Sequence, residues 1–274
     1  MRRPAGDARR PRPAADRAPR EYWLSGRRPV AQALEAGRVR RLVVAVGAGG
    51  LDPLEAAAAA AGIPCERRPR AEVDRLAGEP AHGCAALVVP PRPADLDALV
   101  AAAAGPAPSL LVALGHLQDP RNVGAIARTA AAVAASGLIV PERRAAPLGG
   151  AAERASAGVL GALPCAVVHN LSWALDRCRS SRLWVYGAAP DGAEVHTAVD
   201  WDRHAVLLLG AEGPGLGPEL RKRCDVLVRL PMWGDVGSLN AAVAAGVLLY
   251  EWARRWREAP PGPSRGPLRG GGAH

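Results

Sequence analysis

The fold is decided by a stretch that runs Asp119-Pro120-Arg121-Asn122-Val123-Gly124-Ala125-Ile126-Ala127-Arg128-Thr129-Ala130. Two later stretches share its predicted layout of a strand, a polar or Gly-rich loop and a helix. They are Leu208-Leu209-Gly210-Ala211-Glu212-Gly213-Pro214-Gly215-Leu216, and Leu230-Pro231-Met232 running on to Gly237-Ser238-Leu239-Asn240. Open α/β sheets build their sites from the loops at the carboxyl ends of strands. We therefore expect the three stretches to form one site.

The composition marks the same stretches. The chain has no Phe and a single Lys, Lys222, although Lys and Arg together number 35. This skew is typical of a GC-rich genome, which also depletes Asn. The remaining asparagines are Asn122, Asn170 and Asn240, and two of them lie in the three stretches, as does Met232. The coincidence is either chance or a sign that the chemistry at these positions resists the mutational pressure.

The net charge and the cysteine pattern indicate which partners and which structural sites to expect. The net charge of +9 favours a polyanionic partner bound through phosphate contacts, although part of the Arg excess lies in the first 20 residues. The 5 cysteines form no C-x-x-C pair, and the histidines share no metal-ligand spacing, so we expect neither disulfides nor a metal. A reducing, cytoplasmic location is the simplest interpretation. No apolar run is long enough for a membrane span or a secretion signal.

Hydrophobic patterning divides the chain into five segments: a disordered basic arm (1–20), a small α/β domain (21–90), a linker (91–108), a second α/β domain (109–257) and a disordered tail (258–274). Expected strands lie at 41–46, 83–89, 110–114, 137–140, 165–168, 183–186, 205–209 and 226–230. Expected helices lie at 51–61, 71–77 and 95–103, then after Pro120, from Ser172, from Gly217 and over 238–256, with a loop at 141–151. This alternation predicts a mainly parallel sheet covered on both faces.

The loop 210–215 limits the kind of ligand. It lacks the G-K-[ST] ending of a phosphate-binding loop. It also does not fit the G-x-G-x-x-G fingerprint that opens a helix in dinucleotide-binding oxidoreductases, because Pro214 and Pro218 intervene. A simple left-handed turn after a strand is the alternative. A ligand without phosphate remains compatible with this loop.

The order and content of the three stretches resemble the SpoU (TrmH-like) family of RNA ribose 2′-O-methyltransferases in the SPOUT class. The similarity covers about 109–256 and extends more weakly back to about Tyr22. It implies a SPOUT-type sheet with a C-terminal trefoil knot, preceded by a small L30-like domain that binds substrate RNA. It further implies S-adenosylmethionine as cofactor, a homodimer, and a guanosine of large-subunit (23S) ribosomal RNA as target. The alternatives are a tRNA guanosine-2′-O-methyltransferase, and an RNA-binding homologue with weak catalysis.

The resemblance also assigns residues to the cofactor. Backbone groups at Gly210, Leu230 and Leu239 are expected to hold the adenine and ribose of S-adenosylmethionine. Leu230, Met232 and Leu239 are expected to form apolar walls. Gly213 and Ser238 complete the predicted cofactor-binding set.

The catalytic set implied by the resemblance is Arg128, Asn122, Glu212, Ser238 and Asn240. The family assigns the deprotonation of the ribose hydroxyl to the residue matching Arg128. Because Arg is a poor base, Arg128 is better suited to bind a phosphate and to stabilise the developing oxyanion. The alternative is that Arg128 is an ordinary surface residue. Asn122 is expected to orient Arg128 or the target ribose. The alternative is that Asn122 serves as a second cap of the helix that begins at Asp119 and Pro120. Glu212 pairs with an Arg, such as Arg128 of either chain of a dimer, or is solvated. Ser238 also fits a helix N-cap.

Three positions depart from the family pattern. Gly115 stands where Asp is usual, Gly161 where an acidic residue is common, and Ala242 where many members have Ser. None of them removes a residue assigned to the reaction. The residues of 241–252 are mostly small and apolar, and the resemblance implies that this last helix lies at the dimer interface.

Overall fold

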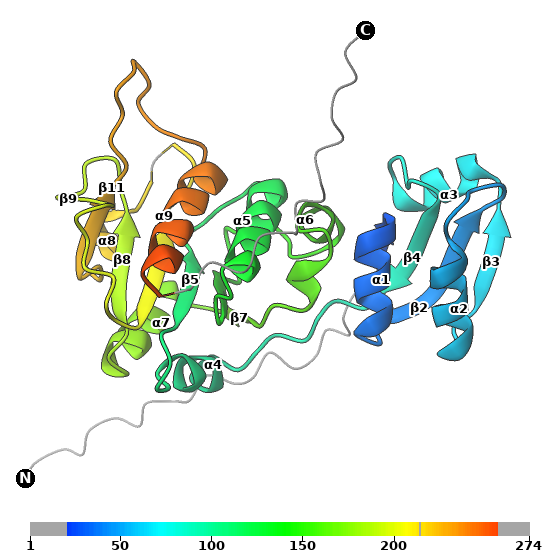
Figure 1. Ribbon diagram of the computed structural model, residues 1–274, viewed down its shortest axis with the longest axis horizontal. Coiled ribbons are helices and arrows are strands. Elements are labelled where there is room, and N and C mark those ends of the chain that lie inside the picture. The colour runs from blue at the N-terminus through cyan, green and yellow to red at the C-terminus, as the bar shows by residue number, and fades with distance from the viewer. Residues whose placement is uncertain (1–20, 214, 257–274) are drawn as a thin grey trace, which may run out of the picture.

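The computed structural model describes residues 21–213 and 215–256. It consists of two units, a smaller N-terminal one and a larger C-terminal one, which are separated along the long axis in Figure 1. The predicted arm (1–20) and tail (258–274) lie outside the described residues. No helix in the described ranges is long and apolar enough to cross a membrane.

The N-terminal unit is a four-stranded sheet in the order β1-β4-β2-β3, in which only β2 and β3 are parallel. Alternate residues of β2 face opposite sides of the sheet: Leu42 and Val44 pack in the cluster with α1 and α2, and Val43 packs with α3. The elements, in chain order, are β1 (Tyr22–Ser25), α1 (Arg27–Glu35), β2 (Val39–Ala45), α2 (Asp52–Ala60), β3 (Cys65–Arg68), α3 (Arg70–Ala77) and β4 (Cys84–Val88).

The C-terminal unit is a seven-stranded sheet in the order β7-β6-β5-β10-β8-β11-β9, and every pairing in it is parallel. Its elements, in chain order, are α4 (Leu96–Ala103), β5 (Leu110–Leu114), α5 (Pro120–Ala132), β6 (Gly137–Pro141), α6 (Gly150–Ala155), a 3-10 turn η1 (Val159–Gly161), β7 (Cys165–Val168), α7 (Leu171–Ser180), β8 (Trp184–Ala188), β9 (Glu194–Val195), β10 (Ala205–Leu209), α8 (Pro218–Arg221), β11 (Val226–Arg229) and α9 (Ala241–Trp256).

The central strand β5 is buried along its whole length. Leu110, Val112 and Leu114 pack with α5 and α9, whereas Leu111 and Ala113 pack with α4 and α7. This confirms the predicted α/β class with a parallel sheet covered on both faces. The chain order reverses between β5 and β10, because β6 and β7 extend the sheet on one side of β5 and β10 lies on the other. Such a reversal is where open sheets place ligands. The trefoil knot stays a prediction.

Several elements differ from the sequence-based expectation. The elements β1, α1, β3 and β9 were not predicted, and the expected loop at 141–151 gives way to α6 at Gly150. The edge strand β3 (Cys-Glu-Arg-Arg) is mostly exposed, so it carries no apolar alternation. In α1, Pro29 lies in the first turn, where the backbone N–H has no helical partner to lose. The helix expected from Gly217 is only the four-residue α8.

Candidate active site

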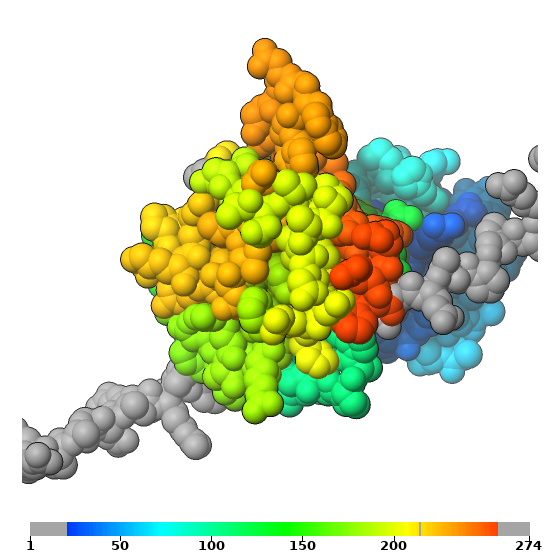
Figure 2. All heavy atoms as spheres, turned by 60° about the vertical axis from the view of Figure 1, so that its left-hand side comes forward, coloured from blue at the N-terminus to red at the C-terminus, as the bar shows by residue number. Residues whose placement is uncertain are grey.

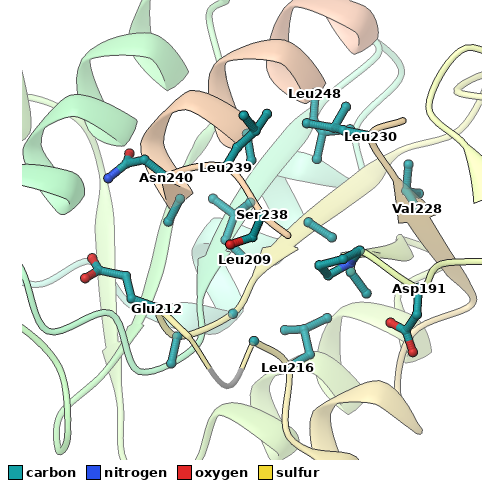
Figure 3. Close-up of a pocket in the computed structure, with 18 of the residues that line it drawn as sticks. Asp191, Leu209, Glu212, Leu216, Val228, Leu230, Ser238, Leu239, Asn240 and Leu248 are labelled. Atoms are coloured by element: carbon teal, nitrogen blue, oxygen red, sulfur yellow. The ribbon is translucent and has the colours of Figure 1, made fainter. Parts of the chain in front are cut away.

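A cavity of about 600 Å³ opens at the carboxyl ends of β8, β10 and β11. Pockets of roughly 300–1,000 Å³ are typical for small-molecule ligands. All six residues predicted to bind the cofactor line it: Gly210, Gly213, Leu230, Met232, Ser238 and Leu239. Figure 3 labels Leu230, Ser238 and Leu239 among them. The sequence prediction and the structure therefore point to the same place.

The Gly-rich loop after β10 folds back on itself at the floor of this cavity. Ala211 and Gly215 exchange backbone hydrogen bonds of 3.1 and 3.0 Å. A Cβ atom at Gly210 would overlap the backbone of Gly215 and Leu216, so only glycine fits there. Gly213 has a φ of +79°, a left-handed conformation that glycine adopts without strain. The glycines are therefore required by the tight turn that shapes the pocket.

The walls of the cavity are mainly apolar. Leu230, Leu239 and Leu248 lie on the side of α9, and Leu209 and Leu216 lie below them in Figure 3. Ser238 places its hydroxyl among these walls (Figure 3). Such a cavity can enclose a flat apolar ring system and hold its edges through backbone groups.

A hydrogen-bonded network joins the three stretches of sequence at the mouth of the cavity. Asn122, which is buried at the start of α5, donates through Nδ2 to Glu212 Oε1. Asn240 Nδ2 in turn donates to Asn122 Oδ1 at 3.1 Å. Glu212 and Asn240 both line the cavity. The side chain of Asn122 thus joins one side chain from each of the other two stretches beside the pocket.

The observed helix caps assign two polar residues differently from the prediction, because Asn240 and not Ser238 caps the last helix. Asp119 accepts from the backbone N–H of Arg121 at 2.8 Å, and so caps α5 ahead of Pro120, as predicted. The last helix begins at Ala241 and not at Ser238. Asn240 Oδ1 accepts from the backbone N–H of Ala242 at 2.9 Å, so Asn240 caps this end. Ser238 is therefore free of the capping role and faces the cavity.

Arg128 does not join the other predicted catalytic residues within one chain. It is exposed on α5 and is absent from the described pocket lining. Glu212 is hydrogen-bonded to Asn122, and no ion pair in the described chain joins it to Arg128. Asn122 and Arg128 are six positions apart along α5, which turns the two side chains to different sides of the helix.

The segment after β8 is a part of the pocket that sequence reasoning missed. Residues 188–191 line the cavity together with Arg221 of α8. Both carboxylate oxygens of Asp191 accept from Arg221, each at 2.9 Å, and this pairing lowers the pKa of Asp191. The available signal was the turn sequence Ala-Pro-Asp-Gly after a buried strand. The strand was predicted to end at Tyr186, but it continues to Ala188.

The donor set of the cavity fits S-adenosylmethionine. Arg221 is the only basic side chain among the described lining residues, and Asp191 neutralises it. Together with Glu212, the lining therefore suits a neutral or cationic ligand without phosphate, such as a sulfonium nucleoside. No group of three or more His, Cys, Asp or Glu side chains in the described part of the chain could hold a metal ion.

The chain belongs to the SpoU rRNA methylase family, whose model matches residues 109–250. A second family model, for RNA 2′-O ribose methyltransferase substrate binding, matches residues 23–94. A tRNA/rRNA methyltransferase of Mycolicibacterium paratuberculosis is 40% identical over 252 residues, which are 90% of this chain and 82% of that protein. The protein is thus a methyltransferase of the tRNA/rRNA class, with a substrate-binding domain ahead of the catalytic domain.

Solved structures give the same result. The SpoU methyltransferase AviRb from Streptomyces viridochromogenes, in complex with AdoMet, superposes with a TM-score of 0.72 at 30% identity, covering 86% of this chain and 90% of that one. The AdoMet-bound rRNA methyltransferase from Sinorhizobium meliloti superposes with a TM-score of 0.72 at 26% identity, covering 88% and 89%. S-adenosylmethionine is the cofactor of this family.

Proposed function

We propose that the protein transfers the methyl group of S-adenosylmethionine to the 2′-hydroxyl of a guanosine in large-subunit ribosomal RNA. The observation that carries the proposal is the network of Asn122, Glu212 and Asn240 at the mouth of the apolar cavity. When bound, the cofactor supplies the electrophilic methyl group. The residues of the chain hold the cofactor, orient the ribose and balance the charge that develops on its oxygen.

The proposed cofactor contacts follow from the lining of the cavity. Backbone groups at Gly210, Leu230 and Leu239 read the adenine and ribose, and the side chains of Leu230 and Met232 enclose them. Ser238, whose hydroxyl lies among the apolar walls, offers a hydrogen bond to the ligand. Gly213 leaves the turn open because it has no side chain.

The proposed catalytic set includes Arg128, a charged residue that does not line the pocket of its own chain. Asn122 and Asn240 orient the ribose through their shared hydrogen bonds, and Glu212 holds Asn122 in place. Arg128 clamps a substrate phosphate and stabilises the developing oxyanion, because its planar fork suits that contact. Since Arg128 is exposed and does not line the pocket of its own chain, we infer that it acts in the site of a second copy.

A homodimer is supported by the exposed apolar face of α9. Val243, Val247 and Tyr250 are 53%, 41% and 58% exposed there. Figure 2 shows α9, in orange to red, open on the surface below the projecting segment 231–240. Helix α9 packs against α5, the helix that carries Arg128. A second copy seated on α9 would cover the apolar face and bring the two pockets close to Arg128.

The N-terminal unit favours ribosomal RNA over tRNA as the substrate. The substrate-binding model and the rRNA methyltransferase from Sinorhizobium meliloti both extend over this unit. The name of the Mycolicibacterium relative leaves tRNA as the alternative. A ribosomal RNA substrate is consistent with a cytoplasmic enzyme.

The test is methylation in vitro with labelled S-adenosylmethionine and two probes, 23S ribosomal RNA and bulk tRNA. Digestion to nucleosides should release labelled 2′-O-methylguanosine from the ribosomal RNA. Label in tRNA alone would replace the substrate by the alternative. Label in neither RNA, from protein that binds S-adenosylhomocysteine, would identify a weakly catalytic RNA-binding homologue.

A further inference from the structure

A polar cluster lies at the contact between the two units, and none of its residues lines the cofactor pocket. It comprises Tyr22 of β1, Arg38 between α1 and β2, and Glu153 of α6. Glu153 is 0% exposed and Arg38 is 7% exposed. Buried charges are costly unless they are paired, so a cluster at this place calls for an explanation that the methyl-transfer site does not provide.

The geometry of the cluster is that of a paired carboxylate with several partners. Arg38 donates through Nη2 to Glu153 Oε1 at 2.6 Å and through Nη1 to Glu153 Oε2 at 3.3 Å. The Tyr22 hydroxyl donates to the same Oε1 and accepts from Arg38 Nη2 at 3.1 Å. Arg38 Nε donates to the backbone oxygen of Val89 at 3.0 Å. Two of the three side chains come from the N-terminal unit and the third from the catalytic unit.

Two glycines of the catalytic unit make room for this contact. A Cβ atom at Gly161 would overlap Arg38 Nη1, and one at Gly158 would lie 2.9 Å from the Cα of Pro29 in α1. Gly161 carries no side chain. In this chain its missing side chain leaves the space that the Arg38 guanidinium occupies. The contact of Arg38 with Glu153 therefore depends on glycine at this position.

Further contacts surround the cluster. Arg154 of α6 forms an ion pair with Glu79 of the N-terminal unit, and Ser25 Oγ donates to that carboxylate at 2.8 Å. The linker is also fixed, because the backbone N–H of Ala94 donates to the oxygen of Cys165 at 2.8 Å. The two units are therefore joined by more than a tether.

We propose that Tyr22, Arg38 and Glu153 are positioning residues that hold the RNA-binding unit in one orientation relative to the cofactor pocket. The proposal rests on the proposed function in one respect, namely that the N-terminal unit binds the RNA. A bidentate buried pair forms only in one relative placement of its partners. Fixing that placement keeps the RNA bound by one unit at a constant distance from the pocket of the other, which raises its effective concentration there.

The test uses Gly161→Ala, which deletes no charge and adds only the methyl group that displaces Arg38. Gly149→Ala is the matched control, because a Cβ at Gly149 meets nothing within 4 Å. Glu153→Gln removes the charge with little change of volume. Each full-length variant is examined by small-angle X-ray scattering, by S-adenosylhomocysteine titration, and by methylation kinetics on 23S ribosomal RNA.

We expect both Gly161→Ala and Glu153→Gln to increase the radius of gyration and to raise KM for the RNA about tenfold, with little change in kcat. S-adenosylhomocysteine affinity should equal that of the wild type, and Gly149→Ala should match the wild type throughout. Unchanged scattering in both variants would overturn the proposal, as would a loss of cofactor affinity parallel to the rise in KM. The scattering result decides the matter even if the wild type methylates a different RNA.

Discussion

Glu212 and Glu153 are two carboxylates that each join segments far apart in the sequence, but their surroundings are opposite. Glu212 is exposed at an open cavity and accepts from the neutral amide of Asn122. Glu153 is fully buried between two units and faces the guanidinium of Arg38. The first carboxylate can exchange its partner when a substrate enters. The second cannot do so without opening the interface, so we assign it to holding the units and assign Glu212 to the reaction site.

The largest expected effect on stability comes from breaking the buried pair. Arg38→Met should leave Glu153 buried without its cation and lower the free energy of unfolding by about 3–5 kcal/mol. The control is Arg40→Met. Arg40 is exposed and its Nε lies 3.9 Å from Glu21 Oε1, and exposed ion pairs of this kind contribute little to stability. The urea midpoints of both variants measure the difference. Equal urea midpoints for the two variants would show that the buried Arg38–Glu153 pair contributes no more stability than the exposed Arg40–Glu21 pair.

The largest expected effect on activity comes from Arg128. Arg128→Ala should lower kcat by about 10²-fold or more, the scale for a lost oxyanion-stabilising group. Arg121→Ala, at another exposed position of α5, should leave kcat unchanged. Arg128→Lys separates the possible roles, since a bidentate clamp suffers nearly as much as with Ala, whereas a base would recover activity at high pH. Wild-type rates for both substitutions would remove Arg128 from the site.

A third substitution tests the floor of the open cavity. Gly210→Ala should displace the backbone of Gly215 and Leu216 and abolish binding of S-adenosylhomocysteine. The wild type should gain about 2.7 kcal/mol of stability at a ligand concentration of 100 Kd, which differential scanning fluorimetry detects as a higher Tm. Gly217→Ala is the control, because a Cβ there meets nothing within 4 Å. Retained ligand stabilisation in Gly210→Ala would place the cofactor elsewhere.

The smallest expected effect is the pH dependence of the stability that the Tyr22 hydroxyl contributes to the buried cluster. Burial, and then the hydrogen bond to Glu153, raise the pKa of the Tyr22 hydroxyl above its ordinary value of 10.0. Because the folded state retains the proton longer than the unfolded state does, this contribution is complete below pH 10 and is lost as the pH rises towards the folded-state pKa.

Tyr22→Phe should therefore cost about 1.5 kcal/mol below pH 10, and its stability should approach that of the wild type at higher pH. Urea unfolding at pH 8 and at increasing pH above 10 measures the two curves. A constant gap between them would show that the Tyr22 hydroxyl does not titrate as described.

The parts of the molecule that the sequence predicted are those with local signals. The strand at Leu110–Leu114 was predicted with its observed ends, because a short run of apolar residues is typical of a strand buried on both faces. The start of α5 was marked by Asp119 and Pro120. The six residues assigned to the cofactor came from the resemblance of three stretches to the SpoU family, and all six line the cavity.

The parts that the sequence did not predict depend on contacts between distant residues. Arg38 and Glu153 are 115 residues apart, and neither lies in a motif, so nothing in the chain indicates that they meet. Gly161 was noticed as a departure, but the need for glycine there depends on the position of Arg38. The start of α9 was placed too early because both Ser238 and Asn240 can cap a helix, and only the hydrogen bond to Ala242 distinguishes them.

A map of ribose methylation in RNA from cells with and without this gene measures the proposed reaction directly. We expect a guanosine of 23S ribosomal RNA to lose its 2′-O-methyl group when the gene is absent. The gene for the wild-type protein should restore the modification, and the gene for Arg128→Ala should not. Identical ribosomal RNA maps with and without the gene, or a loss confined to tRNA, would contradict the account.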